Sequence, residues 1–322
     1  MWYKEAMKLY SSYGDKFLKH VSPIDGRVHS SFMQMVDTGR TSSSSPNVQQ
    51  IPRDPEYRAC FEEEDGYTLV IADYSSQEVL LAADLYKEES ILEAMASGVD
   101  FHLRTASIAY NEEITDPSDY RRQIAKTIIF ATIYGAGPSK IAAQFGMPLK
   151  EAKRIVEAVK LAYPNLMSGL ESKFEQTIKD GYITTNAYSK RRIYIQDFEE
   201  YRRLKEKLHR FKQYGWDIRP DLKDKLSYTE SLIRRKSFNY PIQSSGADMA
   251  KVAGAILRKR SLETGLFQLV LLAHDEWVVR CREENSQQVA EILSKSMVEA
   301  SALILTHSKA KAKAIVSKQW LK

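Results

Sequence analysis

The fold is decided by the stretch Phe267-Gln-Leu-Val-Leu-Leu-Ala-His-Asp-Glu-Trp-Val-Val-Arg-Cys281, in which a short polar break separates two apolar runs. Such a pattern predicts a β-hairpin. A second apolar run, Thr68-Leu-Val-Ile-Ala-Asp73, predicts a buried strand that ends in an acid. Few strands among many helices predict an α+β fold. Helical patterns cover about 1–20, 76–92, 117–134, 148–162, 165–179, 199–214, 247–262 and 284–301, and a short strand follows near the C-terminus.

Composition narrows the class of protein without deciding its function. The 322 residues are 43% hydrophobic and 28% charged, enough to bury the core of one large domain or two smaller ones. A formal net charge of +5 permits a polyanionic partner but does not require one. Cys60 and Cys281 form neither a disulfide framework nor a CxxC metal motif. With no apolar run near ~20 residues and no signal peptide, we expect a soluble, cytoplasmic protein without a membrane partner.

Two acids stand at the ends of predicted strands. Asp73 closes one strand, and Asp275 lies in the turn between two others. An Asp at such a position also serves simply to satisfy nearby backbone groups. Taken together, however, two carboxylates at the ends of adjacent strands can converge on one sheet edge and hold two Mg²⁺ ions about 4 Å apart. Magnesium favours one or two carboxylates combined with substrate phosphates, so the pair predicts phosphoryl-transfer chemistry.

A stripe of four residues, Arg122, Lys126, Phe130 and Tyr134, recurs at every fourth position before Gly135. In a helix each step of four drifts by only about 40°, so these four residues share one face. The face is cationic at its N-terminal end and aromatic at its C-terminal end, which matches the polarity of a nucleoside triphosphate. The alternative is an ordinary amphipathic helix with its aromatic side chains in the core and its cations in water.

At these residues the sequence resembles DNA polymerases of family A, the bacterial DNA polymerase I kind. Asp73-Tyr-Ser-Ser-Gln-Glu78 resembles motif A, the 122–134 stripe with Gly135 resembles motif B, and His274-Asp-Glu276 resembles motif C. The HDE tripeptide alone is weak, but three motifs in this order are specific. Further likeness, from about residue 5 to Trp320, lies in 38–52, 238–243 and 100–102.

The resemblance implies a right-hand polymerase palm, with an antiparallel sheet and helical fingers. It implies a template-directed DNA polymerase that transfers deoxynucleotides from dNTPs to a primer 3′-hydroxyl, with two Mg²⁺ ions for which Mn²⁺ can substitute. The implied subdomains are 1–100 for the end of the thumb and the first part of the palm, 101–235 for the fingers and 236–322 for the rest of the palm. The implied compartment is the cytoplasm of a bacterium or of a phage-infected host.

The same resemblance implies a role for each matching residue. Asp73, Asp275 and the backbone carbonyl of Tyr74 would bind the metals, with Glu276 beside them near the primer end. The expected nucleotide-binding residues are Glu78 as a steric gate against the 2′-hydroxyl, His102, Arg122 and Lys126 on the triphosphate, Phe130 stacked on the incoming nucleotide, and Tyr134 at the template-base pocket. The expected primer–template contacts are Arg40, Asn47, Gln50, Arg235, Asn239, Gln243 and His274. Gln and Asn suit a duplex because minor-groove acceptors occupy similar places in every base pair.

The sequence departs from the family pattern in several places. Ser76 and Gln77 replace the usual Gln and Ile, Ala131 replaces a Gly, and Arg104 stands where some members carry an acid. These changes bear on rate and fidelity rather than on the type of reaction. Family members carry a thumb, and often a 3′–5′ exonuclease, before the palm. We therefore expect a separate subunit that carries both, as in a split enzyme of the phage type, with an excised fragment as the alternative.

Two basic segments remain outside the motifs. Residues 199–230 form an insert whose basic helix predicts a contact with DNA or with a partner, or else a solvated face. Lys309, Lys311 and Lys313 would share one face of the last strand, as a basic rim or as a guard against edge-to-edge aggregation.

Three rival functions use some of the same residues. A metal-dependent nuclease would need the paired acids but not the 122–134 stripe. A non-catalytic DNA-binding relative of a polymerase has no need for Asp73, Lys126 and Asp275 together. A single-subunit RNA polymerase shares parts of the motifs, but Glu78 disfavours it.

Overall fold

The computed structural model describes residues 2–321, without the side chains of Trp2 and Glu5. The chain divides into two compact units. Unit 1 consists of residues 1–75, 246–303 and 310–322, and unit 2 of residues 76–245 and 304–309. The subdomain boundaries expected after residues 100 and 235 remain a prediction, since contacts within the chain instead divide it after residues 75 and 245. None of the described helices is both long enough and apolar enough to cross a membrane.

Unit 1 is built on a four-stranded antiparallel sheet in the order β6-β7-β3-β8. The strands are β3 (Tyr67–Tyr74), β6 (Phe267–Ala273), β7 (Glu276–Arg282) and β8 (Ala312–Ser317). The predicted hairpin is confirmed as β6 and β7, and the predicted buried strand as β3, which lies between β7 and β8. Since β3 is buried along most of its length, its apolar run covers both faces of the sheet.

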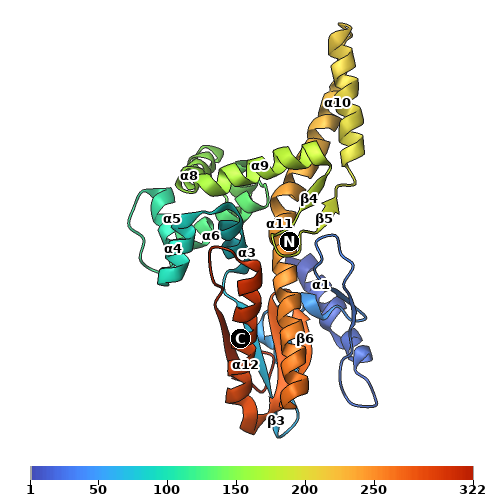
Figure 1. Ribbon diagram of the computed structural model, residues 1–322, viewed down its shortest axis with the longest axis vertical. Coiled ribbons are helices and arrows are strands. Elements are labelled where there is room, and N and C mark those ends of the chain that lie inside the picture. The colour runs from blue at the N-terminus through green and yellow to red at the C-terminus, as the bar shows by residue number, and fades with distance from the viewer. Residues whose placement is uncertain (1, 322) are drawn as a thin grey trace. The chain divides into compact units, whose positions relative to one another are not determined.

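Helices cover one face of this sheet (Figure 1). They are α12 (Ser286–Ile304) and the second part of α11 (Pro220–Thr264). The Trp277 indole N–H donates to the Ala250 carbonyl at 3.0 Å, and the Tyr74 hydroxyl donates to the Met297 carbonyl at 2.8 Å. Gly254 on α11 gives the Trp277 ring its room, since a Cβ there would lie 2.5 Å from the ring. Burial, together with the negative charge of Asp275, raises the pKa of Tyr74 above its ordinary value.

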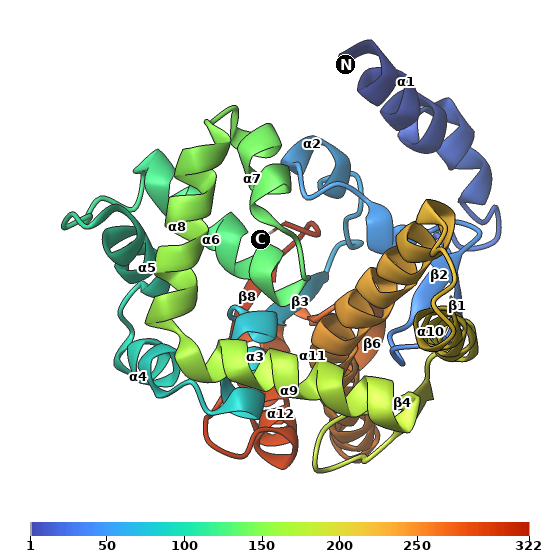
Figure 2. The same ribbon diagram turned by 90° about the horizontal axis from the view of Figure 1, so that it is seen from above.

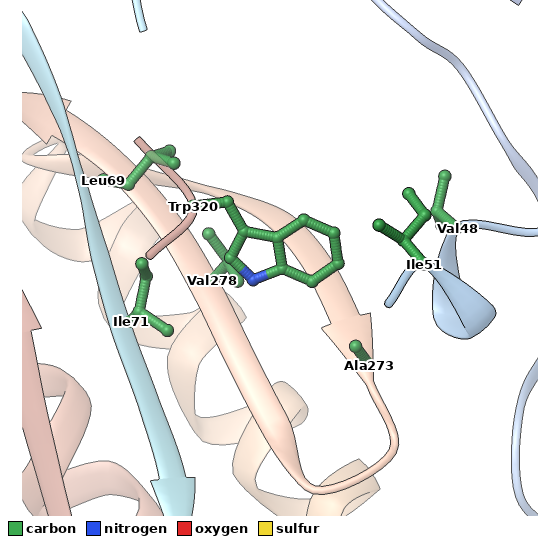
Figure 3. Close-up of a cluster of buried hydrophobic side chains, with 7 residues drawn as sticks. All are labelled: Val48, Ile51, Leu69, Ile71, Ala273, Val278 and Trp320. Atoms are coloured by element: carbon green, nitrogen blue, oxygen red, sulfur yellow. The ribbon is translucent and has the colours of Figure 1, made fainter. Parts of the chain in front are cut away.

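The N-terminal segment and the end of the chain provide the hydrophobic core on the other face. Figure 3 shows the cluster around the Trp320 indole, to which Leu69 and Ile71 contribute from β3. Its other members are Val48, Ile51, Ala273 and Val278. The elements of the N-terminal segment are α1 (Trp2–Tyr13), η1 (Asp15–His20), β1 (Ser31–Met33), β2 (Ser42–Ser44), η2 (Val48–Gln50) and α2 (Pro55–Arg58). The helix expected over 1–20 is thus α-helical only to Tyr13 and then becomes a 3₁₀ turn.

Unit 2 is mainly helical, with α5, α6 and α8 in mutual contact (Figure 2). Asp100 caps the N-terminus of α5, and Asp119 caps that of α6, each by accepting backbone N–H groups. The elements are α3 (Gln77–Tyr86), α4 (Glu89–Ser97), α5 (Phe101–Tyr110), α6 (Tyr120–Ile133), α7 (Pro138–Phe145), α8 (Leu149–Ala162), α9 (Pro164–Asp180), β4 (Tyr182–Thr184), β5 (Arg192–Tyr194), α10 (Phe198–Gln213) and the first part of α11.

Helix α11 differs in length from the helix that the sequence predicts. A helix was expected only from about residue 247, but α11 begins at Pro220 and runs for 45 residues. Pro241 lies inside it, although Pro lacks the N–H group that a helix interior needs. The Ser245 hydroxyl donates to the Pro241 carbonyl at 2.7 Å, so a side chain makes a bond to the backbone one turn away.

Candidate active site

The sheet register brings the two acids to one edge of unit 1. Asp73 on β3 lies directly opposite Glu276 on β7. A two-residue turn, His274-Asp275, joins β6 to β7, and His274 adopts φ 61° as the first residue of that turn. Asp275 is therefore the chain neighbour of the residue that pairs with Asp73, and paired residues have Cα atoms only about 4.5–5.5 Å apart. The register thus brings the two acids to the same end of the sheet, and the meeting of their carboxylates stays a prediction.

Glu276 differs from its two acidic neighbours because it is only 5% exposed and already has partners. Arg58 Nη1 forms an ion pair with it, 3.3 Å from Oε1, and the Trp320 indole N–H donates to the same oxygen at 2.8 Å. The Arg58 guanidinium also stacks over the Trp320 ring, 4.1 Å from its centroid. The Glu276 carboxylate is thus held by Arg58 of α2 and by Trp320. These contacts fix Glu276, the first residue after the His274-Asp275 turn.

The donor set at this edge fits a divalent ion that is shared with substrate. Within residues 2–321 no group of three or more His, Cys, Asp or Glu side chains is arranged as a metal site. Magnesium, however, is usually held by only one or two carboxylates together with substrate phosphates and water. Asp73 and Asp275, both partly accessible, would supply those carboxylates, and the Tyr74 carbonyl stays the expected third ligand.

The 122–134 stripe lies on α6 of unit 2. Its four members are each partly exposed, whereas Ile124, Ile128 and other residues of the opposite face are buried. In the alternative interpretation of an ordinary amphipathic helix, Phe130 and Tyr134 would be buried and the cations fully exposed, and neither is the case. The stripe is therefore an accessible surface with both cationic and aromatic character.

At the N-terminal end of the stripe, Arg122 is engaged with Asp100. Two of its guanidinium nitrogens lie 2.7 and 2.8 Å from one Asp100 oxygen. Burial raises the pKa of Asp100, but the hydrogen bonds from Arg122 and from the backbone N–H groups of Leu103 and His102 outweigh it and hold that pKa below its ordinary value. Asp100 therefore fixes the guanidinium of Arg122 while it caps α5.

His102 is 6% exposed, and its Nδ1 has no hydrogen-bond partner. Burial lowers the pKa of His102 to about 4, and the nearby charges of Lys126 and Arg122 lower it further against the opposing effect of Asp100. At neutral pH the ring is therefore uncharged. A phosphate would meet this side chain as a neutral hydrogen-bond donor, while the positive charge would come from Lys126 and Arg122.

At the C-terminal end of the stripe, the Tyr134 hydroxyl donates to a carboxylate oxygen of Glu78. Glu78 belongs to the first turn of α3, directly after Ser76, which adopts a left-handed conformation at φ 49°. The backbone thus turns sharply between the strand that carries Asp73 and the helix that carries Glu78. The hydrogen bond fixes the orientation of the Glu78 carboxylate, as a steric gate would require.

Some of the expected DNA contacts gather in unit 1. Arg40 and His274 line the same small pocket, although they lie far apart in sequence. The Asn47 side chain caps η2, and Gln50 is exposed. The neighbouring Gln49 is buried and donates to Thr41 and to the Leu272 carbonyl, so it serves the fold. The pocket is lined by Gly39, Arg40, Thr41, Ala247, Ala250, Lys251, Leu272 and His274.

The other expected DNA contacts lie on the unit 2 part of α11. Arg235, Asn239 and Gln243 follow one another at every fourth position and so share a helix face. The amide oxygen of Asn239 is buried without a hydrogen-bond partner, an arrangement that proteins rarely leave unsatisfied. Gly135, after the stripe, has φ 66°, and a Cβ there would lie 3.2 Å from Cγ of Arg235. The backbone thus approaches this face closely.

Sequence reasoning missed the contacts made by three further residues at these sites. Arg58 and Trp320 hold Glu276, and Asp100 holds Arg122. Asp100 stood in a recognised motif, but its partner could not be inferred from spacing. Arg58 is 218 residues from Glu276, and Trp320 is 44 residues from it, so no local periodicity connects them. A buried acid next to a functional turn was the one available signal that a cation would be needed.

Comparison with known proteins places the chain among polymerases. DNA polymerase I of Pseudomonas aeruginosa is 31% identical over 309 residues, which cover 94% of this chain and 31% of the relative. Thermostable DNA polymerase I of Thermus aquaticus is 31% identical over 302 residues, which cover 92% of this chain and 33% of the relative. The chain therefore spans about a third of the length of these two relatives.

A solved structure has the same fold. It is described as the POL domain of Pol1 from M. smegmatis in complex with DNA primer-template and dNTP. The TM-score is 0.83 at 26% sequence identity, and the match covers 98% of this chain and 52% of that chain. The family model of DNA polymerase family A matches residues 1–322. The agreement extends over the whole sequence, and the chain belongs to DNA polymerase family A.

Proposed function

We propose that the chain is a DNA-directed DNA polymerase that adds deoxynucleotides to the 3′-hydroxyl of a primer on a DNA template. The observation that carries the proposal is the placement of Asp73 and Asp275 at one sheet edge in a chain matched throughout by the family. The reaction joins the primer oxygen to the α-phosphorus of the nucleotide and releases pyrophosphate. Two divalent ions, when bound, would activate the hydroxyl and neutralise charge on the phosphates.

The protein groups divide the work between two sets. Asp73 and Asp275 would hold the ions, and Glu276, fixed by Arg58, would keep the acidic turn in place. Lys126 supplies a point charge for the triphosphate, and Arg122 supplies a planar fork held ready by Asp100. Catalysis of this kind depends on positioning and charge rather than on covalent chemistry.

Nucleotide selection would depend on Glu78. Its carboxylate would occupy the space of a ribose 2′-hydroxyl, and the hydrogen bond from Tyr134 keeps it there. Phe130 would stack on the incoming nucleotide. This assignment favours a DNA polymerase over a single-subunit RNA polymerase.

The activity is tested with a labelled primer–template, Mg²⁺ and dNTPs. We expect primer extension by the chain, loss of extension in Asp73→Asn and in Asp275→Asn, and retained folding of both variants by circular dichroism. Shortening of the primer instead of extension would favour the metal-dependent nuclease. Binding without any pyrophosphate release would favour the non-catalytic relative. Extension that survives both substitutions would refute the assignment of the acids.

The separate thumb and exonuclease subunit stays a prediction. If it exists, proteins encoded near this chain should include one that co-elutes with it on size exclusion and increases the length of product made per binding event, because additional phosphate contacts slow dissociation from DNA. If no such complex forms, the split-enzyme hypothesis is wrong, while the proposed reaction is unaffected.

A further inference from the structure

The proposed function makes no use of the helical pair formed by α10 and the first part of α11. The two helices lie side by side (Figure 1), and an ion pair joins Lys225 on α11 to Glu200 on α10 at 2.7 Å. Tyr201 is buried, and Leu204 and Leu208 are partly buried, so α10 uses one face for packing. The other residues of α10 are exposed, except the partly buried Phe198 and Phe211.

A row of cations runs along the exposed surface of α10. Arg203, Lys207 and Arg210 follow one another at intervals of four and three, and the same row continues to Tyr214 at the end of the helix. All four side chains are exposed, and no described acidic side chain forms an ion pair with the three cations. The distance from Arg203 to Tyr214 along the axis is about 16 Å at 1.5 Å per residue. We call the three cations the 203–210 stripe.

The 203–210 stripe ends at a group of aromatic rings, which we call the tip: the partly buried Phe211 and the exposed Tyr214 and Trp216. The Tyr214 and Trp216 rings are stacked with centroids 5.3 Å apart, and Phe211 meets Trp216 edge to face at 5.4 Å. Tyr214 is 60% exposed and Trp216 is 58% exposed. Two large aromatic side chains held in a fixed arrangement yet largely in water indicate a surface for a ligand.

We propose that the 203–210 stripe and the tip form a binding site for single-stranded DNA, separate from the site of nucleotide addition. The cations would follow the phosphates of the strand, and Tyr214 or Trp216 would stack on an unpaired base. A row of cations that leads to exposed aromatic rings is the combination by which proteins bind single strands without reading sequence.

The same observations disfavour the other occupants of such a surface. A DNA duplex would engage the cations but keeps its bases stacked, so the tip would gain nothing from it. The centre of a protein interface is depleted of charged residues, whereas unpaired cations here lie directly beside the aromatic rings. A strand with unpaired bases accounts for both parts of the surface.

The test compares substitutions in the full chain, without Mg²⁺ or nucleotides, so that binding is measured apart from polymerisation. Fluorescence anisotropy with a labelled oligo(dT) strand and with a duplex of equal length gives the two affinities as a function of NaCl. The stripe variant is Lys207→Gln with Arg210→Gln. Its matched control is Lys205→Gln with Lys212→Gln, which removes the same charge about half a turn around the same helix. The tip variant is Trp216→Ala, and its control is the exposed Tyr228→Ala on α11.

We expect the stripe variant to reduce the magnitude of the salt slope for oligo(dT) by about 1.4, at 0.7 per lost phosphate contact, and its control to change it far less. Trp216→Ala should weaken oligo(dT) binding roughly 5- to 100-fold with little effect on the duplex. In the unsubstituted chain, oligo(dT) should quench tryptophan fluorescence, and Trp216→Ala should remove that quenching.

The proposal is overturned if the stripe and tip variants, folded as judged by circular dichroism, bind oligo(dT) as the unsubstituted chain does. It is equally overturned if both variants lose duplex and single-strand affinity to the same extent, which would indicate a duplex contact. Loss of a co-purifying protein with unchanged oligo(dT) affinity would identify a protein-docking surface instead. Failure of primer extension alone would count against the proposed function but leave this site standing.

Discussion

Replacing Arg58 with Ala should destabilise the protein far more than the loss of an ordinary surface arginine. The Arg58 and Glu276 side chains are 9% and 6% exposed, so their ion pair is buried. Removing one partner of such a pair leaves a buried carboxylate without its counter-charge, which typically costs about 3–5 kcal/mol. The Trp320 indole N–H would remain as a donor to Glu276 and moderates the loss. We therefore expect the lower half of that range, about 3 kcal/mol.

The assay is urea unfolding of the purified chain, followed by tryptophan fluorescence and circular dichroism. A matched control is Arg27→Ala, because Arg27 is also paired with acids but is 38% exposed and should contribute less than about 1 kcal/mol. The double variant Arg58→Met with Glu276→Gln removes both charges while roughly keeping volume and an oxygen that accepts from the Trp320 indole N–H. It should recover part of the stability lost in Arg58→Ala, since the penalty arises from the unpaired charge.

Two results would refute this reasoning. If Arg58→Ala costs no more than the Arg27 control, Glu276 does not depend on its buried partner. If the double variant is as unstable as Arg58→Ala, the loss comes from packing around Trp320 rather than from charge. Below its unfolding transition, Arg58→Ala should also lower the rate of primer extension at saturating dNTP with a smaller effect on KM, because Asp275 precedes Glu276 in the chain.

Other substitutions test other parts of the structure. The pKa of His102 is lowered to about 4 in the folded chain, so between about pH 6.5 and 4 the unfolded chain binds a proton that the folded chain does not, and the free energy of unfolding should fall by up to about 3 kcal/mol as the pH falls through that window. In His102→Gln, urea unfolding at pH 7.5 and 4.5 should show a smaller difference in stability between the two pH values. An unchanged difference would contradict the assignment. Glu78→Ala should relax discrimination against ribonucleotides in primer extension. Tyr134→Phe removes only the hydrogen bond to Glu78 and should relax this discrimination less. Unchanged selectivity in both variants would argue against Glu78 as the steric gate. Gly254→Ala would place a Cβ 2.5 Å from the Trp277 ring and should cost about 1–3 kcal/mol in urea unfolding, whereas no loss would mean that the ring moves freely.

The parts of the fold that the sequence predicts are those with strong local periodicity. The apolar runs of β3 and β7 mark the strands because both faces of the sheet are covered there, whereas β6 is an apolar run that stays partly exposed. The acids stand out because they lie at the ends of these runs. The 122–134 stripe is visible because one helix carries all four residues. In each case the signal lies within about fifteen consecutive residues.

The parts that the sequence does not predict depend on contacts between distant segments. The first half of α11 was missed, and Pro241 argues for a break in a helix that in fact continues through it. The partners of Glu276 come from α2 and from the end of the chain, and such pairing is decided by tertiary packing alone. The short strands β1, β2, β4 and β5 have three residues each, too few for any periodicity to show.

The discontinuous origin of the sheet has a consequence for how the protein is made. Strand β3 is the first of the four strands of this sheet to be synthesised, because β7 begins only at Glu276 and β8 only at Ala312. At 5–20 residues per second, roughly 10–40 seconds pass between the synthesis of β3 and that of β7. During this time both hydrogen-bonding edges of β3 have no partner strand. The helices of unit 2 form from local contacts during that interval. Asp73 and Asp275, by contrast, cannot come together until synthesis is nearly finished. The nascent chain therefore carries an exposed strand for most of its translation, which makes it a natural client for chaperones.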